Sequence, residues 1–289
     1  MNTLRWDLLL QRERPQAMYD KEVHGLIKKL FAENFADDPN LRKKFLETFD
    51  AWIMGSQLNQ ISGLDSFPDR DVIVGVTQYL DDLYQMFGPR IVVIENEYRY
   101  HWRLNPNITV RSLATLQTGD ILILSMPFPQ CGDIHPQTNL ILQKCADLNI
   151  PVHIDSCWYG CTRDITFNYD HSAIQSVGFS LSKSLGLGVN RIGVRYARKR
   201  WNGPVSLIND FNMTIHVLMW MGIQFMTRLG PDFWQKKYGK HYVHVCSTLN
   251  LQPTKAIHIA LEQKKDSSHS PVGVRRLLRK LGDFPCENL

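Results

Sequence analysis

Short, mainly apolar segments that alternate with helix-like segments are the feature that most constrains the fold of this chain. These apolar segments are residues 72–74, 91–94, 121–124, 150–154, 177–181 and 192–194. Strands that are apolar along their whole length are buried on both faces, which is typical of parallel sheets covered by helices. The pattern therefore predicts an α/β fold with a mostly parallel central sheet and helices on both of its faces.

Helical periodicity surrounds this central region. Residues 20–53 are predicted to form helices interrupted at residues 37–40, and residues 205–226 are long and apolar enough for one extended helix. After about residue 229 the chain becomes basic and aromatic, which indicates a smaller α+β subdomain. The predicted units are an N-terminal helical segment (1–54), a large α/β domain (55–228) and a small C-terminal subdomain (229–289).

Several classes of protein are excluded by composition. The chain has 289 residues, of which 44% are hydrophobic, and this is enough for a sizeable core. No apolar stretch approaches the roughly 18 to 20 residues that a membrane helix needs. The first residues contain an acid, Asp7, and no apolar signal region, so we expect a cytoplasmic protein without membrane partners. Six irregularly spaced cysteines indicate free thiols, and no metal site is expected.

A lysine follows the predicted strand that ends near Ser180, in the sequence Ser-Leu-Ser-Lys. Two glycines that permit tight turns come next, and Arg191 lies eight residues after Lys183. A lysine that is desolvated or close to another cation can lose its proton and act as a nucleophile. The hydroxyls of Ser180 and Ser182 and the guanidinium of Arg191 supply donors for a dianionic phosphate.

A carboxylate, Asp155, closes another predicted strand 28 residues before Lys183. Because the ends of parallel strands meet at one edge of a sheet, Asp155 and Lys183 are expected in the same crevice. A buried aspartate there can pair with a protonated pyridine nitrogen and keep the ring an electron sink. An amine nucleophile, phosphate donors and this carboxylate together indicate pyridoxal phosphate as the cofactor.

These segments resemble the fold-type I pyridoxal-phosphate enzymes, specifically the class I/II aminotransferases typified by aspartate aminotransferase. The resemblance extends from about Tyr19 to Val194 and is weaker before Gly75. It implies that Lys183 is the catalytic, Schiff-base lysine. The cofactor-binding residues that it implies are Asp155, Ser180, Ser182, Arg191, Gly75, Val76, Thr77 and Tyr98.

The resemblance also assigns roles to the residues outside the lysine segment. Gly75, Val76 and Thr77 correspond to the loop whose backbone amides receive the phosphate at a helix N-terminus. Tyr98 falls where the family has an aromatic ring stacked on the cofactor. Family members are homodimers with the active site at the interface, and the apolar stretch from Phe211 to Phe225 fits either that interface or the internal core.

Two departures from the family concern the donors to the cofactor's phenolic oxygen. Pro129 stands where the family commonly has the asparagine of an Asn-Pro-x-Gly turn, and Trp158 stands where it has a tyrosine. Proline has no side-chain donor, and indole offers a single N–H. We place Trp158 among the cofactor-binding residues. The sequence leaves open whether Trp158, Tyr159 or Gln130 replaces the missing donors.

The third departure is in the C-terminal region, where the family has an arginine for the substrate carboxylate. No arginine aligns with it, so Arg275 and Arg276, on a helix predicted at 272–281 after a polar loop at 263–271, are the candidates. A basic exposed helix is the simpler explanation for these two arginines, so they are candidates only. From residue 195 onward the chain carries 15 basic and 6 acidic residues, a bias that can also mark a surface for nucleic acid or another anion. No nucleic-acid-binding motif accompanies it.

The leading hypothesis is an aminotransferase-like enzyme that acts on an amino acid or a related amine, with Lys183 as general base and acid. A decarboxylase, lyase or racemase on the same scaffold is an alternative, because nothing in the sequence selects the bond that is broken. A non-catalytic protein of this fold that binds an anionic partner through its basic C-terminal region is the other alternative.

Overall fold

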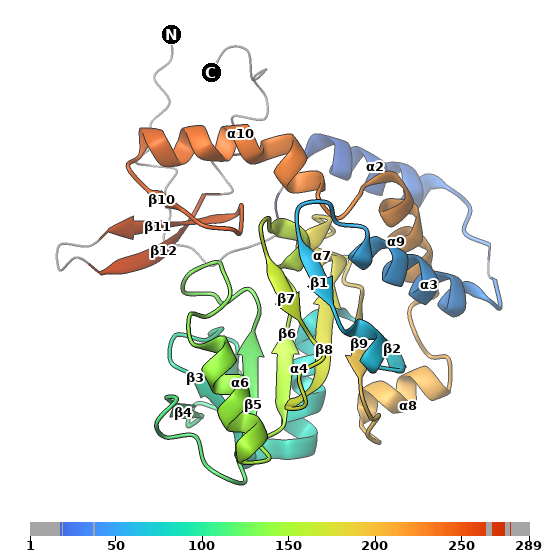
Figure 1. Ribbon diagram of the computed structural model, residues 1–289. Coiled ribbons are helices and arrows are strands. Elements are labelled where there is room, and N and C mark those ends of the chain that lie inside the picture. The colour runs from blue at the N-terminus through green and yellow to red at the C-terminus, as the bar shows by residue number, and fades with distance from the viewer. Residues whose placement is uncertain (1–17, 19, 37, 264–267, 275–277, 279–289) are drawn as a thin grey trace.

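The computed structural model describes residues 18, 20–36, 38–263, 268–274 and 278, and Figure 1 shows its central sheet between helices. The helices are α2 (Lys21–Ala32), α3 (Leu41–Met54), α4 (Gly75–Phe87), α5 (His101–Leu104), α6 (Thr138–Asp147), α7 (Leu181–Ser184), α8 (Pro204–Asp210), α9 (His216–Arg228) and α10 (Phe233–Thr248). The strands are β1 (Gln60–Ser62), β2 (Asp69–Ile73), β3 (Ile91–Ile94), β4 (Thr109–Arg111), β5 (Ile121–Ser125), β6 (Val152–Asp155), β7 (Thr166–Asn168), β8 (Ile174–Ser180), β9 (Gly193–Ala197), β10 (Gln252–Pro253), β11 (Ile259–Gln263) and β12 (His269–Gly273). Single 3₁₀ turns occupy Leu64–Ser66, Gly88–Arg90 and Tyr159–Cys161.

The central sheet has seven strands in the order β2-β9-β8-β6-β5-β3-β4. Strands β8, β6, β5, β3 and β4 run parallel to one another, whereas β9 runs antiparallel to both β2 and β8. Since β2 and β8 are each antiparallel to β9, they point the same way as the parallel strands. The predicted mostly parallel α/β sheet is confirmed, and the carboxyl ends of six strands lie at one edge.

Both faces of this sheet are buried, as the apolar segments predicted. In β3, Val92 and Ile94 belong to the core cluster that contains side chains of α2, α3, α6 and α9. Ile91 and Val93 belong to the opposite cluster, which contains side chains of α4. Adjacent strand residues point to opposite faces, so a strand buried on both sides must be apolar at every position.

The extended helix predicted at 205–226 is wrong. The segment forms two helices, α8 and α9, and Asn212 between them has a left-handed φ of 52°. Asparagine tolerates this conformation, which cannot continue a right-handed helix. The break divides the apolar stretch, because Phe211 is 68% exposed whereas Phe225 is buried.

The C-terminal region contains α10 and a three-stranded antiparallel sheet, β10-β11-β12 (Figure 1). This small α+β arrangement was predicted, but its local structure was not. The polar loop expected at 263–271 overlaps β12, and the helix expected at 272–281 is wrong at its start, because Val272 pairs with Ala260 in a β-ladder. Arg275 and Arg276 lie outside the described residues. The boundaries of the three proposed units stay a prediction.

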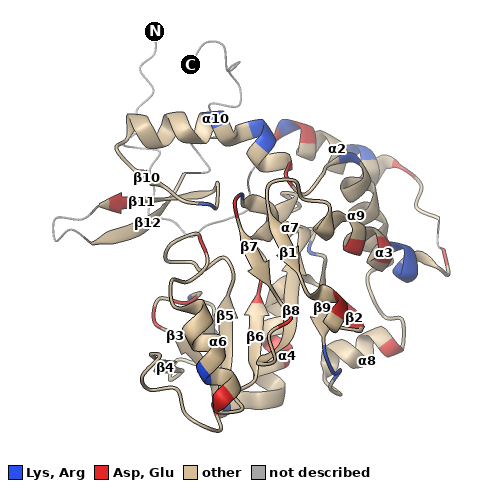
Figure 2. Ribbon diagram, in the orientation of Figure 1, with Lys and Arg blue, Asp and Glu red and all other residues tan. Residues whose placement is uncertain are grey.

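Charged residues lie mainly on the helices and loops around the sheet (Figure 2). Within the described part of the chain, no helix combines the length and apolar character needed to cross a membrane.

One charged side chain is fully buried at the β9 side of the sheet. Arg195, on β9, is 0% exposed and forms ion pairs with Asp71 of β2 and, at 2.8 Å, with Asp82 of α4. It also donates to Ser206 Oγ of α8 at 2.8 Å and lies over the Trp201 ring. This guanidinium therefore joins two strands and two helices.

We expect Arg195→Met to destabilise the protein by about 3–5 kcal/mol, because two buried carboxylates lose their shared cation. Urea unfolding measures this change. Lys43→Met is the control, since the Lys43–Glu47 pair is mostly exposed and contributes about 0.5 kcal/mol or less. A change for Arg195→Met as small as that of the control would contradict this account.

Candidate active site

A narrow cavity opens where β5, β6 and β8 end. Its lining consists of Tyr98, Ser125, Pro127, Pro129, Asp155, Cys157, Trp158 and Lys183. The sequence pointed to Lys183, Asp155, Tyr98 and Trp158, and these four do lie together. Ser125, Pro127 and Cys157 were not predicted, because they lie beside Lys183 only once the ends of β5 and β6 and the segments after them are brought together with α7.

The strand register explains why these residues meet. Ser125 is the last residue of β5 and pairs with Asp155, the last residue of β6. Asp155 in turn pairs with Gly178 of β8, two residues before that strand ends and α7 begins. Lys183 lies on α7, so the short turn from β8 carries it over the end of β6.

The Lys183 ammonium lies among polar and aromatic groups. Its Nζ is 3.8 Å from Cys157 Sγ, 5.4 Å from the Tyr98 ring centroid and 5.0 Å from the Trp158 ring centroid. Burial disfavours the ammonium, but the negative charges that Cys157, Tyr98 and Asp155 can carry outweigh burial, and the pKa of Lys183 is raised. In this arrangement Lys183 holds its proton, in contrast to the free amine that the sequence suggested.

Asp155 is buried, with 3% of its surface exposed. One carboxylate oxygen accepts a hydrogen bond from the Cys157 backbone N–H at 2.9 Å. Burial raises the pKa of Asp155, and this hydrogen bond and the charge of Lys183 only partly oppose the rise. A buried carboxylate with so few donors has a strong preference for a cationic partner.

The backbone of Lys183 is held from the C-terminal region. Trp234 of α10 donates from Nε1 to the Lys183 carbonyl at 3.2 Å, and Cys161 Sγ lies 3.3 Å from the same oxygen. Gly186, with a φ of +67°, allows the close approach, because a Cβ there would lie 2.7 Å from the Trp234 ring. No sequence signal could have linked Trp234 to Lys183, since 51 residues separate them.

A second group of predicted residues meets at the start of α4. Arg191 donates from Nη2 to Thr77 Oγ1 at 2.6 Å and from Nε to the Val74 carbonyl at 3.3 Å. Gly75 has a φ of +70°, and a Cβ at that position would lie 2.7 Å from Arg191 Nη2. Glycine is therefore required both by the turn and by the guanidinium packed on it. Val76, also predicted, is buried in the first turn of this helix.

Sheet topology brings Ser180 and Ser182 to the same edge. Ser180 pairs with Gly193 across β8 and β9, and Gly193 pairs with Ile73 at the end of β2. Ser180 Oγ caps α7 by accepting from the Ser182 N–H at 3.1 Å. Ser182 Oγ is buried and has no hydrogen-bond partner among the described residues.

Tyr98 is affected by the charges of both the Lys183 group and the Arg191 group. Burial raises the pKa of Tyr98, and the positive charges of both Lys183 and Arg191 oppose this rise. Both cations therefore act on the Tyr98 hydroxyl, which places the Lys183 group and the Arg191 group in one residue's electrostatic surroundings.

The three residues considered as replacement donors to the cofactor's phenolic oxygen lie in different surroundings. Gln130 donates its amide to the His269 carbonyl at 3.3 Å, and Tyr159 packs edge-on against Phe179 in the core. Trp158 lines the cavity, and its buried Nε1 has no partner among the described residues. Of the three, only Trp158 belongs to the Lys183 cavity.

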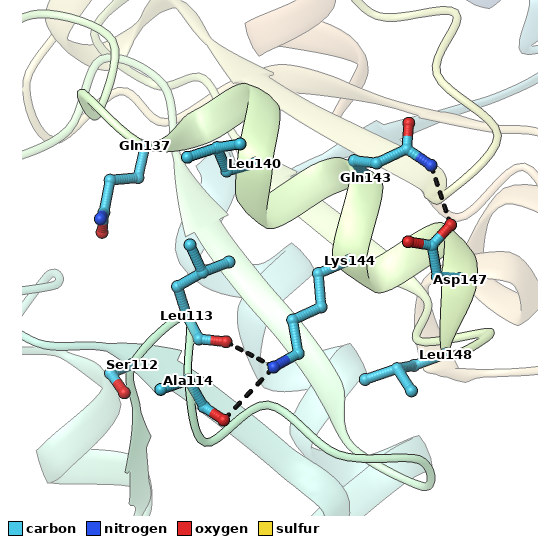
Figure 3. A pocket seen from close by; sticks show the side chains of 9 residues that line it. All are labelled: Ser112, Leu113, Ala114, Gln137, Leu140, Gln143, Lys144, Asp147 and Leu148. Carbon is cyan, nitrogen blue, oxygen red and sulfur yellow. Dashed lines mark hydrogen bonds between the residues drawn. The ribbon is translucent and has the colours of Figure 1, made fainter.

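A hollow of about 800 Å³ lies elsewhere, between α6 and residues 112–114 (Figure 3). Its one ammonium, Lys144, is bound by the carbonyls of Leu113 and Ala114 at 2.7 and 3.3 Å. Its carboxylate, Asp147, accepts from Gln143 at 2.8 Å. Both charged groups of this hollow therefore already have hydrogen-bond partners.

Comparison with known proteins relates the fold to solved structures. No protein-family model matches the sequence, and no curated protein matches it. The structure is similar to tyrosine aminotransferase from Leishmania infantum, with a TM-score of 0.64, 12% identity, and coverage of 97% of this chain and 96% of that one. It is also similar to a Thermus thermophilus aspartate aminotransferase mutant, with a TM-score of 0.62, 13% identity and 98% of each chain covered. The chain has the aminotransferase fold.

A third similar structure is the PLP-bound C-S lyase from Staphylococcus hominis, with a TM-score of 0.63, 10% identity, and coverage of 98% of this chain and 92% of that one. The aminotransferase-like fold inferred from the sequence resemblance is confirmed. Because proteins named for two different reactions share this fold, the fold does not select the reaction.

We expect Gly75→Ala to destabilise the protein by about 2 kcal/mol, because it places a Cβ against Arg191 in a left-handed conformation. Thermal unfolding followed by circular dichroism measures this. The matched control is Gly25→Ala, in the interior of α2, where a Cβ meets nothing within 4 Å. The control should be neutral or stabilising by up to about 1 kcal/mol. Equal effects of the two substitutions would contradict the assignment of Gly75 to a packed turn.

Proposed function

We propose that this protein is a pyridoxal-phosphate-dependent enzyme that transfers the amino group of an amino acid or related amine. The observation that carries the proposal is the convergence of Lys183, Asp155 and Tyr98 in one cavity, with Arg191 at the adjoining start of α4. An amine, a buried carboxylate, an aromatic ring and phosphate donors are the groups that this cofactor needs.

The start of α4 fits the phosphate. The first backbone N–H groups of a helix lack partners within the helix, so those of Gly75, Val76 and Thr77 are suited to an anion. Arg191 adds a fixed guanidinium that already contacts Thr77. The unpartnered hydroxyl of Ser182 can donate to the same phosphate, with Ser180 holding the Ser182 backbone.

The groups that line the cavity match those that the pyridine ring of the cofactor needs. Asp155 can pair with a protonated pyridine nitrogen, Tyr98 offers an aromatic face, and the orphan Trp158 Nε1 can donate to a phenolic oxygen. The free space is only about 10 Å³, near the size of one water molecule. Lys183, which lines that space, must therefore move aside when the ring enters.

We assign the proton transfer at the substrate carbon to Lys183. Pyridoxal phosphate, when bound, supplies a ring that withdraws electrons from the reacting carbon of the substrate. Pairing of Asp155 with a cation removes one of the charges that raise the pKa of Lys183. Lys183 Nζ can then give up its proton and act as the base and acid at the substrate carbon.

Transamination competes with decarboxylation, lyase or racemase chemistry on the same scaffold. The similar structures are named as aminotransferases and as a C-S lyase, so lyase chemistry is the best supported of these alternatives. The substrate arginine is unassigned, since Arg275 and Arg276 lie outside the described residues.

The alternative of a non-catalytic anion binder is less well supported. Several basic residues of the described C-terminal region are paired with acids: Lys237 contacts Asp20 and Glu22 at 2.8 Å each, and Lys255 contacts Asp133 at 2.9 Å. Such pairing lowers the positive potential available to a nucleic acid.

A homodimer is part of the same proposal. Leu207, Phe211 and Met213 are 58%, 68% and 70% exposed, and this apolar surface on α8 and the following turn is suited to a second copy. A cytoplasmic location stays a prediction.

We expect the purified protein, loaded with pyridoxal phosphate, to convert an amino donor into one equivalent of 2-oxo acid per protomer without releasing ammonia. A screen of amino acids with detection of 2-oxo acid, ammonia, thiol and carbon dioxide measures this. Lys183→Ala should reduce the rate at least about 100-fold, because it removes the general base.

The control is Lys199→Ala, which removes an exposed lysine outside the cavity and should leave the rate unchanged. Catalytic release of ammonia with a thiol would assign the lyase reaction instead. Equal rates for Lys183→Ala and the wild type would refute the role of Lys183.

A further inference from the structure

A buried carboxylate that the proposed chemistry does not use lies directly behind the Lys183 cavity. Glu97 is 3% exposed. One carboxylate oxygen accepts from its neighbour, the Tyr98 N–H, at 2.7 Å, and the other accepts from the Ser125 N–H at 2.8 Å. Tyr98 and Ser125 both line the cavity. Glu97 is therefore bound to two walls of the site and is not itself part of its lining.

The geometry follows from the way β3 ends. Strand β3 pairs with β5 only as far as Val93 and Ile123, after which the chain turns through Asn96, whose φ is 67°. The Ser125 N–H, at the end of β5, then faces the side from which β3 has departed. The Glu97 side chain supplies the acceptor that the strand no longer provides, and a buried N–H without an acceptor would be costly.

The surroundings of Glu97 bring the pKa of its carboxyl group close to neutral pH. Burial raises the pKa of Glu97 to about 7, and the charge of Asp155 on β6 adds to the rise, while its hydrogen bonds to Ser125 and Tyr98 oppose it. The other titratable groups on this side are Tyr84 of α4, whose pKa is itself raised, first by burial and then by the charge of Glu97, and His101 of α5.

His101 is buried and hydrogen bonded through Nδ1 to the Tyr84 hydroxyl at 3.1 Å, and burial lowers its pKa to about 4. It is therefore neutral near pH 7. The charge of Lys183 in the cavity acts on Asp155 and Tyr98 and opposes the rise in the pKa of each.

We propose that Glu97 is a positioning residue that, as a carboxylate, fixes Tyr98 and Ser125 around the Lys183 cavity and releases one of them when it is protonated. A carboxylate accepts at both oxygens, whereas a carboxylic acid has one oxygen that carries a hydrogen and cannot serve both N–H donors equally well. The inference deepens the proposed function and rests on it where the cavity ligand is pyridoxal phosphate.

The test compares wild type with Glu97→Gln, because a carboxamide mimics the protonated acid. We expect the dissociation constant for pyridoxal phosphate to be about tenfold larger in Glu97→Gln than in wild type at pH 8, since hydrogen bonds to a charged group are lost. At pH 5.5 the two proteins should differ less than about twofold, because wild-type Glu97 is then protonated. Taking the ratio at each pH cancels the ionisation of the free ligand.

Amide hydrogen exchange of the ligand-free proteins provides the second readout. Glu97→Gln should lose protection at one of the two amides, Tyr98 or Ser125, at pH 8 and keep it in β9. Glu95→Gln is the matched control, since Glu95 is exposed two residues earlier, and it should resemble the wild type in both measurements. An affinity ratio that is the same at both pH values, or unchanged exchange at both amides, would overturn the proposal. If wild type binds no pyridoxal phosphate, the proposed function fails, and the exchange data alone decide the role of Glu97.

Discussion

The parallel pairing of β5, β6 and β8 is the constraint on which the site depends. It places Ser125, Asp155 and Gly178 in one row, and the short turn after β8 then carries Lys183 over the end of β6. The antiparallel strand β9 returns the chain beside β2, so that Arg191 reaches the start of α4. A change in register by one residue would turn each of these side chains to the opposite face of the sheet. Strand pairing thus determines which chemical groups meet.

Burial determines how those groups behave. It raises the pKa of Asp155 and Glu97, and the acidic neighbours of Lys183 keep its ammonium protonated despite its own burial. Asp155 thus lines the cavity as a buried carboxylate next to the Lys183 ammonium, while Glu97 lies behind it, bound to Tyr98 and Ser125. The same balance makes the proton on Glu97 sensitive to pH in the neutral range.

The sequence predicted the parts of this structure that local patterns encode. Apolar strands, the lysine after β8, the aspartate that ends β6 and the glycine that begins α4 each have a local physical requirement. The structure brings the lysine and the aspartate together in one cavity and the glycine together with Arg191. The break at Asn212 was missed because a single left-handed residue is invisible to apolar periodicity. Trp234, Cys157 and Glu97 were missed because their roles arise from contacts between distant segments. The β12 strand was mistaken for a loop and a helix, since its pairing with β11 outweighs its polar composition.

We propose that Lys183 is the residue that binds pyridoxal phosphate covalently. The most direct measurement is borohydride reduction of the protein after addition of pyridoxal phosphate, followed by protease digestion and mass spectrometry of the peptides. We expect the cofactor mass to stay on the peptide containing Lys183, in about one equivalent per protomer. Retention on scattered surface lysines, or no retained cofactor on the Lys183 peptide, would contradict it.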